Sequence, residues 1–148
     1  MQKMLIKNRK AFHDYEILET LESGVVLFGH EVKSLKNGQG NFTGSFISLS
    51  NGEAWLKNFH VSLYEKATTV EPDPDRPKKL LLHKKELAML EKNLKTKGNT
   101  IIPLACGLHK GKIKFEIALV RGKKNYDKRE SLKQKDQDRR VRAAIKDY

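Results

Sequence analysis

The fold is decided by residues 100–120, which read TIIPLACGLHKGKIKFEIALV. In the second half of this stretch every other residue is apolar, and charged residues stand between most of them. The apolar positions are Ile113, Phe115, Ile117 and Leu119. Period-two alternation is typical of a strand with one buried face. We therefore predict two antiparallel strands, 100–108 and 112–120, joined by a turn at 109–111.

Two earlier segments predict hairpins. Residues 15–22 place Tyr15, Ile17 and Leu21 on one side, and the turn Glu22-Ser23-Gly24 separates them from the apolar run 25–28. Further along, the dipeptide Asn51-Gly52 is a strong turn signal between a strand at 46–49 and one that begins at 54–56.

Two helices complete the predicted body. One covers 30–36, and the clearer one covers about 84–97, where Leu87, Leu90 and Leu94 form an apolar stripe before Gly98. About six short strands with glycine turns favour a mainly β fold, a small antiparallel barrel with flanking helices. The pattern alone does not separate a barrel from a β-sandwich.

The composition points to a polyanionic partner. The 148 residues suffice for one domain with a real core, and the net charge is +12. Nucleic acid is the first candidate partner, and an anionic membrane surface is the second. The single cysteine suits a reducing compartment, and no apolar run approaches the roughly 18 residues of a membrane span. We expect a cytoplasmic protein without a membrane partner.

Residues 123–148 predict a separate basic tail after a folded body of residues 1–122. Apolar residues are too few there to offset an ordering cost of about 1–2 kcal/mol per residue, so we expect disorder in the free protein. Val141, Ile145 and Tyr148 nevertheless fall on one helical face, which favours a helix formed against a partner. The alternative is an inert solubilising end.

The segment 121–130 joins body and tail, and it sets Tyr126 between Lys124 and Lys128. Cations around one aromatic ring suit phosphate contact with base stacking, although a solvated charge run would look similar.

The sequence shows no catalytic or metal-binding constellation. The five histidines are too far apart for local metal spacing, and Cys106 lies in an apolar strand, as a core residue would. We predict no cofactor, no metal and no enzymatic activity. An RNA-cleaving or RNA-modifying enzyme on a small barrel, and a constitutive ribosomal protein, remain alternatives.

Four separated blocks, in order, resemble the SsrA-binding protein family, the small protein B of bacterial trans-translation. The blocks are Asn8-Arg9-Lys10-Ala11, Gly29-His30-Glu31-Val32-Lys33-Ser34-Leu35 with Gly38 and Asn41, Asp73-Pro74-Asp75-Arg76 with Lys79-Leu80-Leu81-Leu82-His83-Lys84, and Gly122-Lys123-Lys124-Asn125-Tyr126-Asp127-Lys128-Arg129-Glu130. The likeness runs from about residue 8 to 131.

The resemblance implies a barrel like the oligonucleotide-binding (OB) fold, with two to three helices. It implies an RNA-binding adaptor, expected as a monomer, that binds the tRNA-like domain of tmRNA and delivers it to stalled ribosomes. The tail would then fold as a helix in the empty mRNA channel near the decoding centre.

The resemblance also implies two sets of site residues. Those expected to bind tmRNA are Asn8, Arg9, Lys10, His13, Glu22, Leu81 and Lys114. Those expected to meet ribosomal RNA are Lys123, Lys124, Tyr126, Asp127, Lys128 and Arg129, with Tyr126 stacking. Because Glu22 repels phosphate, it would either contact the edge of a base or orient a lysine side chain. The alternative is a solvated turn residue without a role in binding. Leu81 would pack under the site or in the core.

Three positions depart from the family pattern. Gly44 stands where aspartate is usual, Leu63 replaces a frequent proline, and Gly107 stands where an aromatic residue is common. The last departure puts a stacking role on that strand in doubt.

Overall fold

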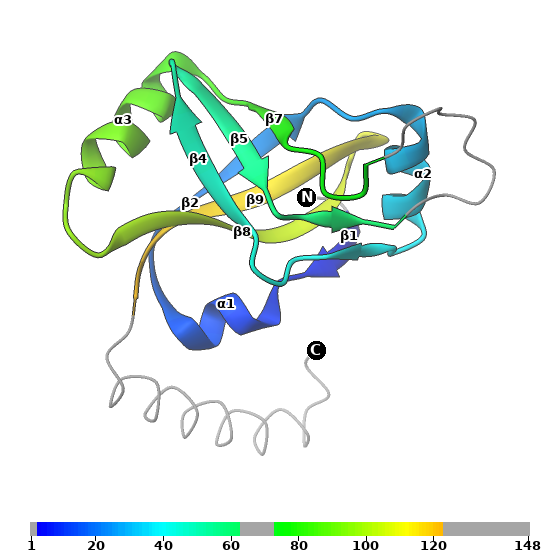
Figure 1. The fold of residues 1–148 in the computed structure, drawn as a ribbon, viewed down its shortest axis with the longest axis horizontal. Helices are drawn as coiled ribbons and strands as arrows, with labels where there is room; N and C mark the ends of the chain where they lie inside the picture. Colours follow the sequence, from blue (N-terminus) through cyan, green and yellow to red (C-terminus); the bar gives the residue numbers. More distant parts are fainter. Residues whose placement is uncertain (1–2, 63–72, 123–148) are drawn as a thin grey trace.

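The structure is a computed structural model that describes residues 3–62 and 73–122. Within these ranges the chain forms nine strands and three helices (Figure 1). Their order is β1 (Lys3–Lys7), α1 (Arg9–Asp14), β2 (Tyr15–Val25), α2 (Gly29–Lys36), β3 (Gly40–Asn41), β4 (Phe46–Ser50), β5 (Glu53–Lys57), β6 (His60–Val61), β7 (Lys78–Leu81), α3 (Lys84–Leu94), β8 (Asn99–His109) and β9 (Lys112–Gly122).

One curled antiparallel sheet dominates the fold. Its strand order is β1-β8-β9-β2-β7-β5-β4, and β3 pairs separately with β6. The sheet curls far enough that β4, at one end, lies beside β8, although the described residues form no ladder between these two strands (Figure 1). The predicted antiparallel barrel is therefore confirmed, and a sandwich of two facing sheets is excluded.

The inside of the barrel is filled by one apolar cluster. At its centre Phe59 lies 4.6 Å from Phe42 and 5.3 Å from Phe115, measured between ring centroids, and the second pair meets edge to face. Offset and edge-to-face contacts are the favourable arrangements for buried rings. Phe115, Ile117 and Leu119 enter this cluster from β9, as their alternation predicts.

The outer face of β9 is also buried at one end of the strand. Ala118 and Val120 pack there with Ile102 and Leu104 of β8 and with Ala11 of α1. The helix α1 thus covers the outer face of the sheet, whereas α3 packs against β8 at the other side (Figure 1). The sequence interpretation missed α1, and it took β9 as a strand with only one apolar face.

Two of the β-bulges, one in β2 and one in β8, change which residues of these strands face the core. The β2–β9 register skips Leu18, and the β8–β9 register skips Leu104. An extra residue reverses the alternation beyond it. Tyr15 and Ile17 accordingly pack in the outer cluster and Leu21 in the inner one, so the prediction that all three share one side was wrong.

The hairpin predicted at residues 15–28 was also wrong. β2 continues without a turn to Val25, because Glu22 and Ser23 pair with β9 and the next two residues pair with Leu80 and Leu81 of β7. The buried Ser23 hydroxyl donates to the Gly24 carbonyl oxygen at 2.8 Å and thereby satisfies its own polar group. The ladder to two neighbouring strands outweighs the turn propensity of Glu22-Ser23-Gly24.

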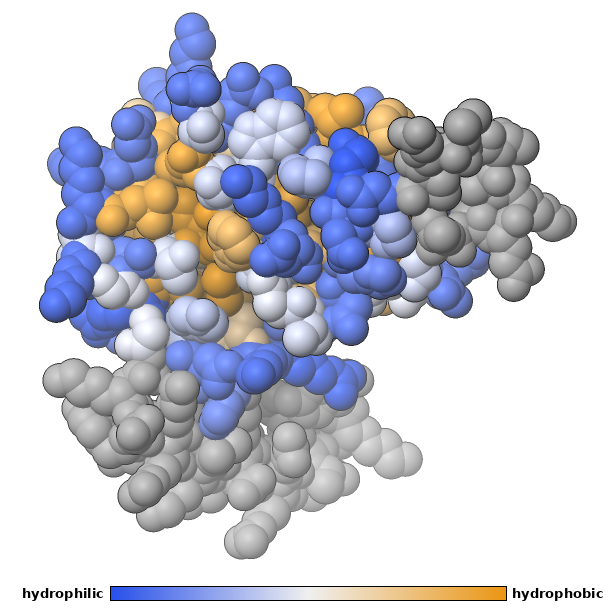
Figure 2. Space-filling model, viewed as in Figure 1, coloured by the Kyte–Doolittle hydropathy of each residue, from blue (hydrophilic) through white to orange (hydrophobic). Residues whose placement is uncertain are grey.

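The predicted turn at Asn51-Gly52 and the two predicted helices are confirmed. Asn51 and Gly52 have φ values of 52° and 72°, so both adopt the left-handed conformation of the predicted hairpin turn. The predicted helix at 30–36 is α2, and the helix predicted over 84–97 is α3, which ends at Leu94. Figure 2 shows apolar surface between α3 and the β4–β5 hairpin, where Leu49, Leu87 and Leu94 line a cavity of about 260 Å³. Among the described helices, none is long and apolar enough to span a bilayer.

A buried charge network ties α2 to the segment before β7. The Glu31 carboxylate is 2% exposed; it accepts hydrogen bonds from Arg76 Nη2 at 2.6 Å and from the Phe28 amide at 2.8 Å. The fully buried Lys78 ammonium donates to the carbonyl oxygens of Phe59 at 3.0 Å and Arg76 at 2.7 Å. Burial lowers the pKa of Lys78, because desolvation outweighs the attraction of Glu31.

We expect Glu31→Gln to lower the free energy of unfolding by about 3 kcal/mol, since it leaves the Arg76 charge without its buried partner. The estimate is at the low end for a buried pair, because Arg76 is 25% exposed. Urea denaturation at pH 7 measures the change. The matched control is Glu53→Gln, whose surface ion pair with Lys79 predicts a loss of about 0–1 kcal/mol. Equal losses in the two variants would contradict the assignment.

Candidate nucleic-acid interface

The predicted RNA-binding residues of the strands meet on the outer face of the sheet. Gly24 of β2 pairs with Leu81 of β7, and Ser23 pairs with Phe115, which places Lys114 beside Gly24. A methyl group built on Gly24 would lie 3.4 Å from Lys114 Nζ and 3.3 Å from Leu81 Cβ. Lys114, Gly24 and Leu81 therefore form one contiguous patch, in which the lysine side chain lies over the glycine.

Leu81 belongs to this surface and is not part of the core. Its side chain is 53% exposed, whereas its neighbour Leu80 points inward and is buried. An exposed leucine beside an ammonium group offers an apolar contact next to a cation. This is the pairing that an unstacked nucleotide uses through its base and its phosphate.

Glu22 lies on the same surface, directly opposite Glu116 of β9. It is an exposed strand residue, so its interpretation as a turn residue was wrong. A carboxylate here cannot bind phosphate, but it can accept hydrogen bonds from the amino and imino groups of a base edge.

The other predicted residues lie at α1. Asn8 anchors the start of this helix: its side-chain amide donates to the Pro103 carbonyl oxygen at 2.8 Å, and its backbone amide donates to that of Leu104 at 2.7 Å. Arg9 and Lys10 follow as exposed residues, and their side chains make no hydrogen bond or ion pair with the described part of the chain. His13 Nδ1 lies 2.9 Å from Asp14 Oδ1.

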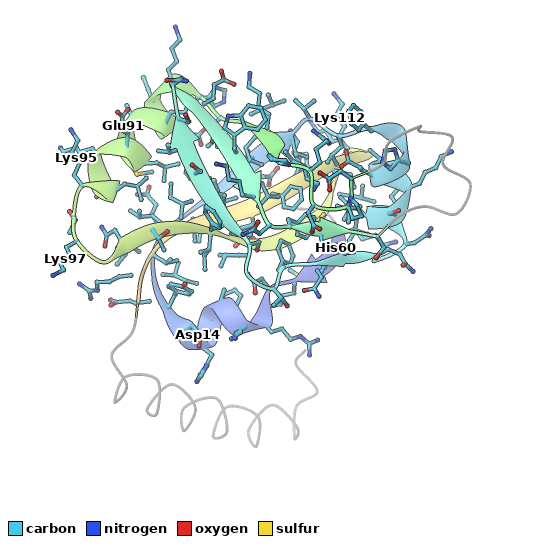
Figure 3. The ribbon with its side chains drawn as sticks, viewed as in Figure 1. Asp14, His60, Glu91, Lys95, Lys97 and Lys112 are labelled. Atoms are coloured by element: carbon cyan, nitrogen blue, oxygen red, sulfur yellow. The ribbon has the colours of Figure 1, made fainter. Side chains whose placement is uncertain are left out.

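The patch around Lys114 and the predicted residues of α1 lie on the same outer face of the sheet, but at separate places on it. Lys114 and Glu116 alternate with core residues on the same side of β9 as Ala118 and Val120, which lie under α1. Six residues of strand separate Lys114 from Val120, or roughly 20 Å. Figure 3 shows Lys112, at the start of β9, far from Asp14 of α1. Figure 2 shows hydrophilic residues covering the α1 end. The interface is therefore elongated, with cations at both ends.

The expected ribosome-binding residues Lys123, Lys124, Tyr126, Asp127, Lys128 and Arg129, the rest of the tail and Leu63 lie outside the described residues. Gly107 of β8 pairs with Lys114 and with the exposed Met4 of β1, so β8 places no aromatic ring beside Lys114. Gly44 has a φ of +76°, a conformation that favours glycine.

Sequence reasoning missed Gly24, which leaves room for the Lys114 side chain. Its place in the motif Glu22-Ser23-Gly24 made it look like a turn glycine. The missed signal was the pair of apolar residues Val25 and Val26 directly after it, which suits a continuing strand as well as a new one.

The described residues contain no group of three or more His, Cys, Asp or Glu side chains arranged to hold a metal ion. Cys106 is fully buried, and desolvation raises the pKa of its thiol from 9.0 to about 12. A thiol in this state is not a nucleophile at neutral pH.

Comparison with known families covers nearly the whole chain. A family model described as SmpB protein matches residues 5–147. The chain belongs to the SmpB protein family. An SsrA-binding protein from Sulfurihydrogenibium sp. (strain YO3AOP1) is 48% identical over 145 residues, which cover 98% of this chain and 95% of the relative. Another from Enterococcus hirae is 46% identical over 146 residues, which cover 99% and 95%.

A solved structure supports the same assignment. It is described as "tmRNA-SmpB: a journey to the center of the bacterial ribosome", and one of its chains superposes with a TM-score of 0.68 at 45% identity. The match covers 85% of this chain and 92% of that one. The SmpB fold therefore includes the curled sheet described above, which agrees with the predicted OB-like barrel.

We expect native Cys106 to react with iodoacetamide at pH 8 about 1,000-fold more slowly than in the denatured chain, because a rise in pKa from 9.0 to about 12 removes nearly all thiolate. Mass spectrometry of timed samples, with and without denaturant, measures the ratio. Comparable rates in both states would show that the strand β8 opens readily or that the thiol is accessible.

Proposed function

We propose that this chain is a non-catalytic RNA-binding adaptor that binds the tRNA-like domain of tmRNA and delivers it to stalled ribosomes. The observation that carries the proposal is the elongated outer face, where Arg9, Lys10 and Lys114 make no ion pair with described residues. Membership of the SmpB family and the likeness to a chain solved with tmRNA support the choice of RNA.

The face suits a folded RNA better than a single short strand. Its cations lie at two separate places, one beside Gly24 and one at α1, and the apolar contact near them comes from scattered side chains such as Leu81, Met4 and the half-buried Phe12. Separated phosphate contacts on a rigid body read the shape of an RNA more than its sequence.

Each predicted residue then has a role. Arg9, Lys10 and Lys114 neutralise phosphates, Leu81 packs against an unstacked base, and Glu22 accepts from a base edge. Asn8 positions α1 through its two bonds to β8. His13, whose Nδ1 lies 2.9 Å from Asp14 Oδ1, stands near the end of the same helix, next to the proposed path of the RNA.

The proposed division of labour separates body from tail. Residues 1–122 grip the tmRNA, while residues 123–148 fold as a helix in the empty mRNA channel near the decoding centre. Lys123, Lys124, Tyr126, Asp127, Lys128 and Arg129 would contact ribosomal RNA, with Tyr126 stacking on a base. Such an adaptor works in the cytoplasm, where the ribosomes are, and one monomer serves each tmRNA.

We expect RNA affinity to fall about 40-fold between 50 and 200 mM salt, because three phosphate contacts give a slope near −3 in a log–log plot. Cutting the chain after Gly122 should leave most of this affinity and abolish rescue of stalled ribosomes. Filter binding to the transcribed tRNA-like domain and a peptide-tagging assay measure the two effects. Loss of RNA binding on truncation would refute the division of labour.

We expect Gly24→Ala to weaken binding of the same RNA about three- to tenfold, since the new methyl group would lie 3.3 Å from Leu81 Cβ and 3.4 Å from Lys114 Nζ, so that the patch must rearrange around it. The matched control is Gly29→Ala, whose methyl group would meet nothing within 4 Å. Circular dichroism should show both variants folded. Equal affinities for the two variants would show that the place of Lys114 does not matter for binding.

A further inference from the structure

A groove with a cavity volume of about 420 Å³ lies between the start of α1 and the segment 40–45, called the loop 40–45 below, which comprises the short strand β3 and the turn that leads to β4. One wall carries Lys7, Arg9 and Lys10. The other wall carries Asn41, Thr43 and Ser45. Ligand sites typically occupy about 300–1,000 Å³, so the groove is large enough to hold part of a ligand.

The groove has a strongly positive balance. Three cations line its first wall, and the lining stretch 40–45 contains no acidic residue. Asp14 is the one carboxylate among the lining residues, and it lies 2.9 Å from His13 Nδ1. The Lys7 ammonium lies 5.0 Å from the centre of the Phe12 ring, which holds this charge next to α1. The balance of charge favours an anionic occupant.

The loop wall is rigid and polar. The Thr43 amide donates to Asn41 Oδ1 at 2.8 Å, and the Ser45 hydroxyl donates to the Phe42 carbonyl oxygen at 2.6 Å. At Gly40 a methyl group would come within 2.8 Å of Ile6 and 2.9 Å of Phe59, so the loop is pressed against the core. Thr43 and Asn41 are exposed at the groove and carry groups that can donate to an anionic oxygen.

Backbone contact fits this groove better than base stacking. Its aromatic lining residues are Phe42, which is buried, and Tyr15, which is half-buried and packs in the outer cluster. Cations on one side and hydroxyl and amide groups on the other are the usual partners of phosphate and ribose oxygens.

We propose that this groove holds the phosphodiester backbone of the bound RNA, with the loop 40–45 as the second wall of the binding site. The inference rests on the proposed function and extends it to the loop 40–45, which has no role in that proposal. The RNA would then be held from both sides at the α1 end, whereas at Lys114 it meets one open surface.

Charge substitutions at Thr43 test the proposal in the full chain. We expect Thr43→Glu to weaken binding of the tRNA-like domain about three- to tenfold. Thr43→Lys should tighten binding by a similar factor, and it should make the slope of log K against log salt more negative by about 0.7–0.9. The matched controls are Thr96→Glu and Thr96→Lys in the exposed turn that follows α3, which should stay within about twofold of the wild type, as phosphate contact is local.

A tethered cleavage reagent gives a second readout that does not depend on affinity. Cys106 is buried and unreactive, so a cysteine introduced by Thr43→Cys can be labelled alone with an iron chelate. Hydroxyl radicals generated there should cut one short backbone segment of the bound RNA. The same reagent at Thr96→Cys should leave that segment intact.

The outcomes separate the two proposals. Wild-type affinity in both Thr43 charge variants, or no cleavage from Thr43→Cys in a complex that still forms, would overturn the groove and leave the adaptor function standing. Wild-type protein that fails to bind the RNA would overturn both.

Discussion

The burial of β9 on both of its faces is the constraint on which the rest of this structure depends. Its inner residues, such as Phe115 and Ile117, fill the barrel, and its outer residues Ala118 and Val120 lie under α1. Only the first half of its outer face remains accessible, with Lys114 and Glu116. One strand therefore fixes the barrel core, the position of α1 and the place of the lysine proposed to meet RNA.

The bulges at Leu18 and Leu104 allow the strands beside β9 to contribute apolar side chains to both of its buried faces. Each inserts one residue opposite β9 and so reverses the alternation of a neighbouring strand halfway along its length. Leu21 can then serve the inner core while Ile17, on the same strand, serves the outer one. Without this reversal Leu21 and Ile17 would point to the same side of β2, and one of the two clusters would lose the side chain that packs into it.

The buried network of Glu31, Arg76 and Lys78 plays a comparable part at the other side of the barrel. It links α2 to the start of β7, and Arg76 lies 4.3 Å from the centre of the exposed Phe28 ring. Because β7 carries Leu81 next to Gly24, this network also holds the far end of the proposed RNA-binding face. The same buried interactions therefore stabilise the fold and position the proposed RNA-binding surface.

Sequence reasoning found what local patterns encode. The alternation in β9, the Asn51-Gly52 turn and the leucine stripe of α3 are properties of neighbouring residues, and the structure contains all three. The hairpin at Glu22–Gly24 was wrong because pairing with two strands outweighs local turn propensity. The six-residue α1 was missed because it is too short to show a helical period, although Ala118 and Val120 hinted at a second buried face. The residues of the site came from family resemblance, and only the register shows that Lys114, Gly24 and Leu81 touch.

The register also has a consequence for the synthesis of this protein. β1 pairs with β8, and β2 pairs with β9, across about a hundred residues of chain. Pairing over such distances in sequence slows folding, because the loop must close before any contact forms. While the chain emerges from the ribosome, β1 and β2 therefore lack their partner strands β8 and β9 until these have been synthesised. A chain released before β9 would lack the strand that joins β8 to β2 and could not close its barrel, so a nascent copy of this protein is itself vulnerable to interrupted translation.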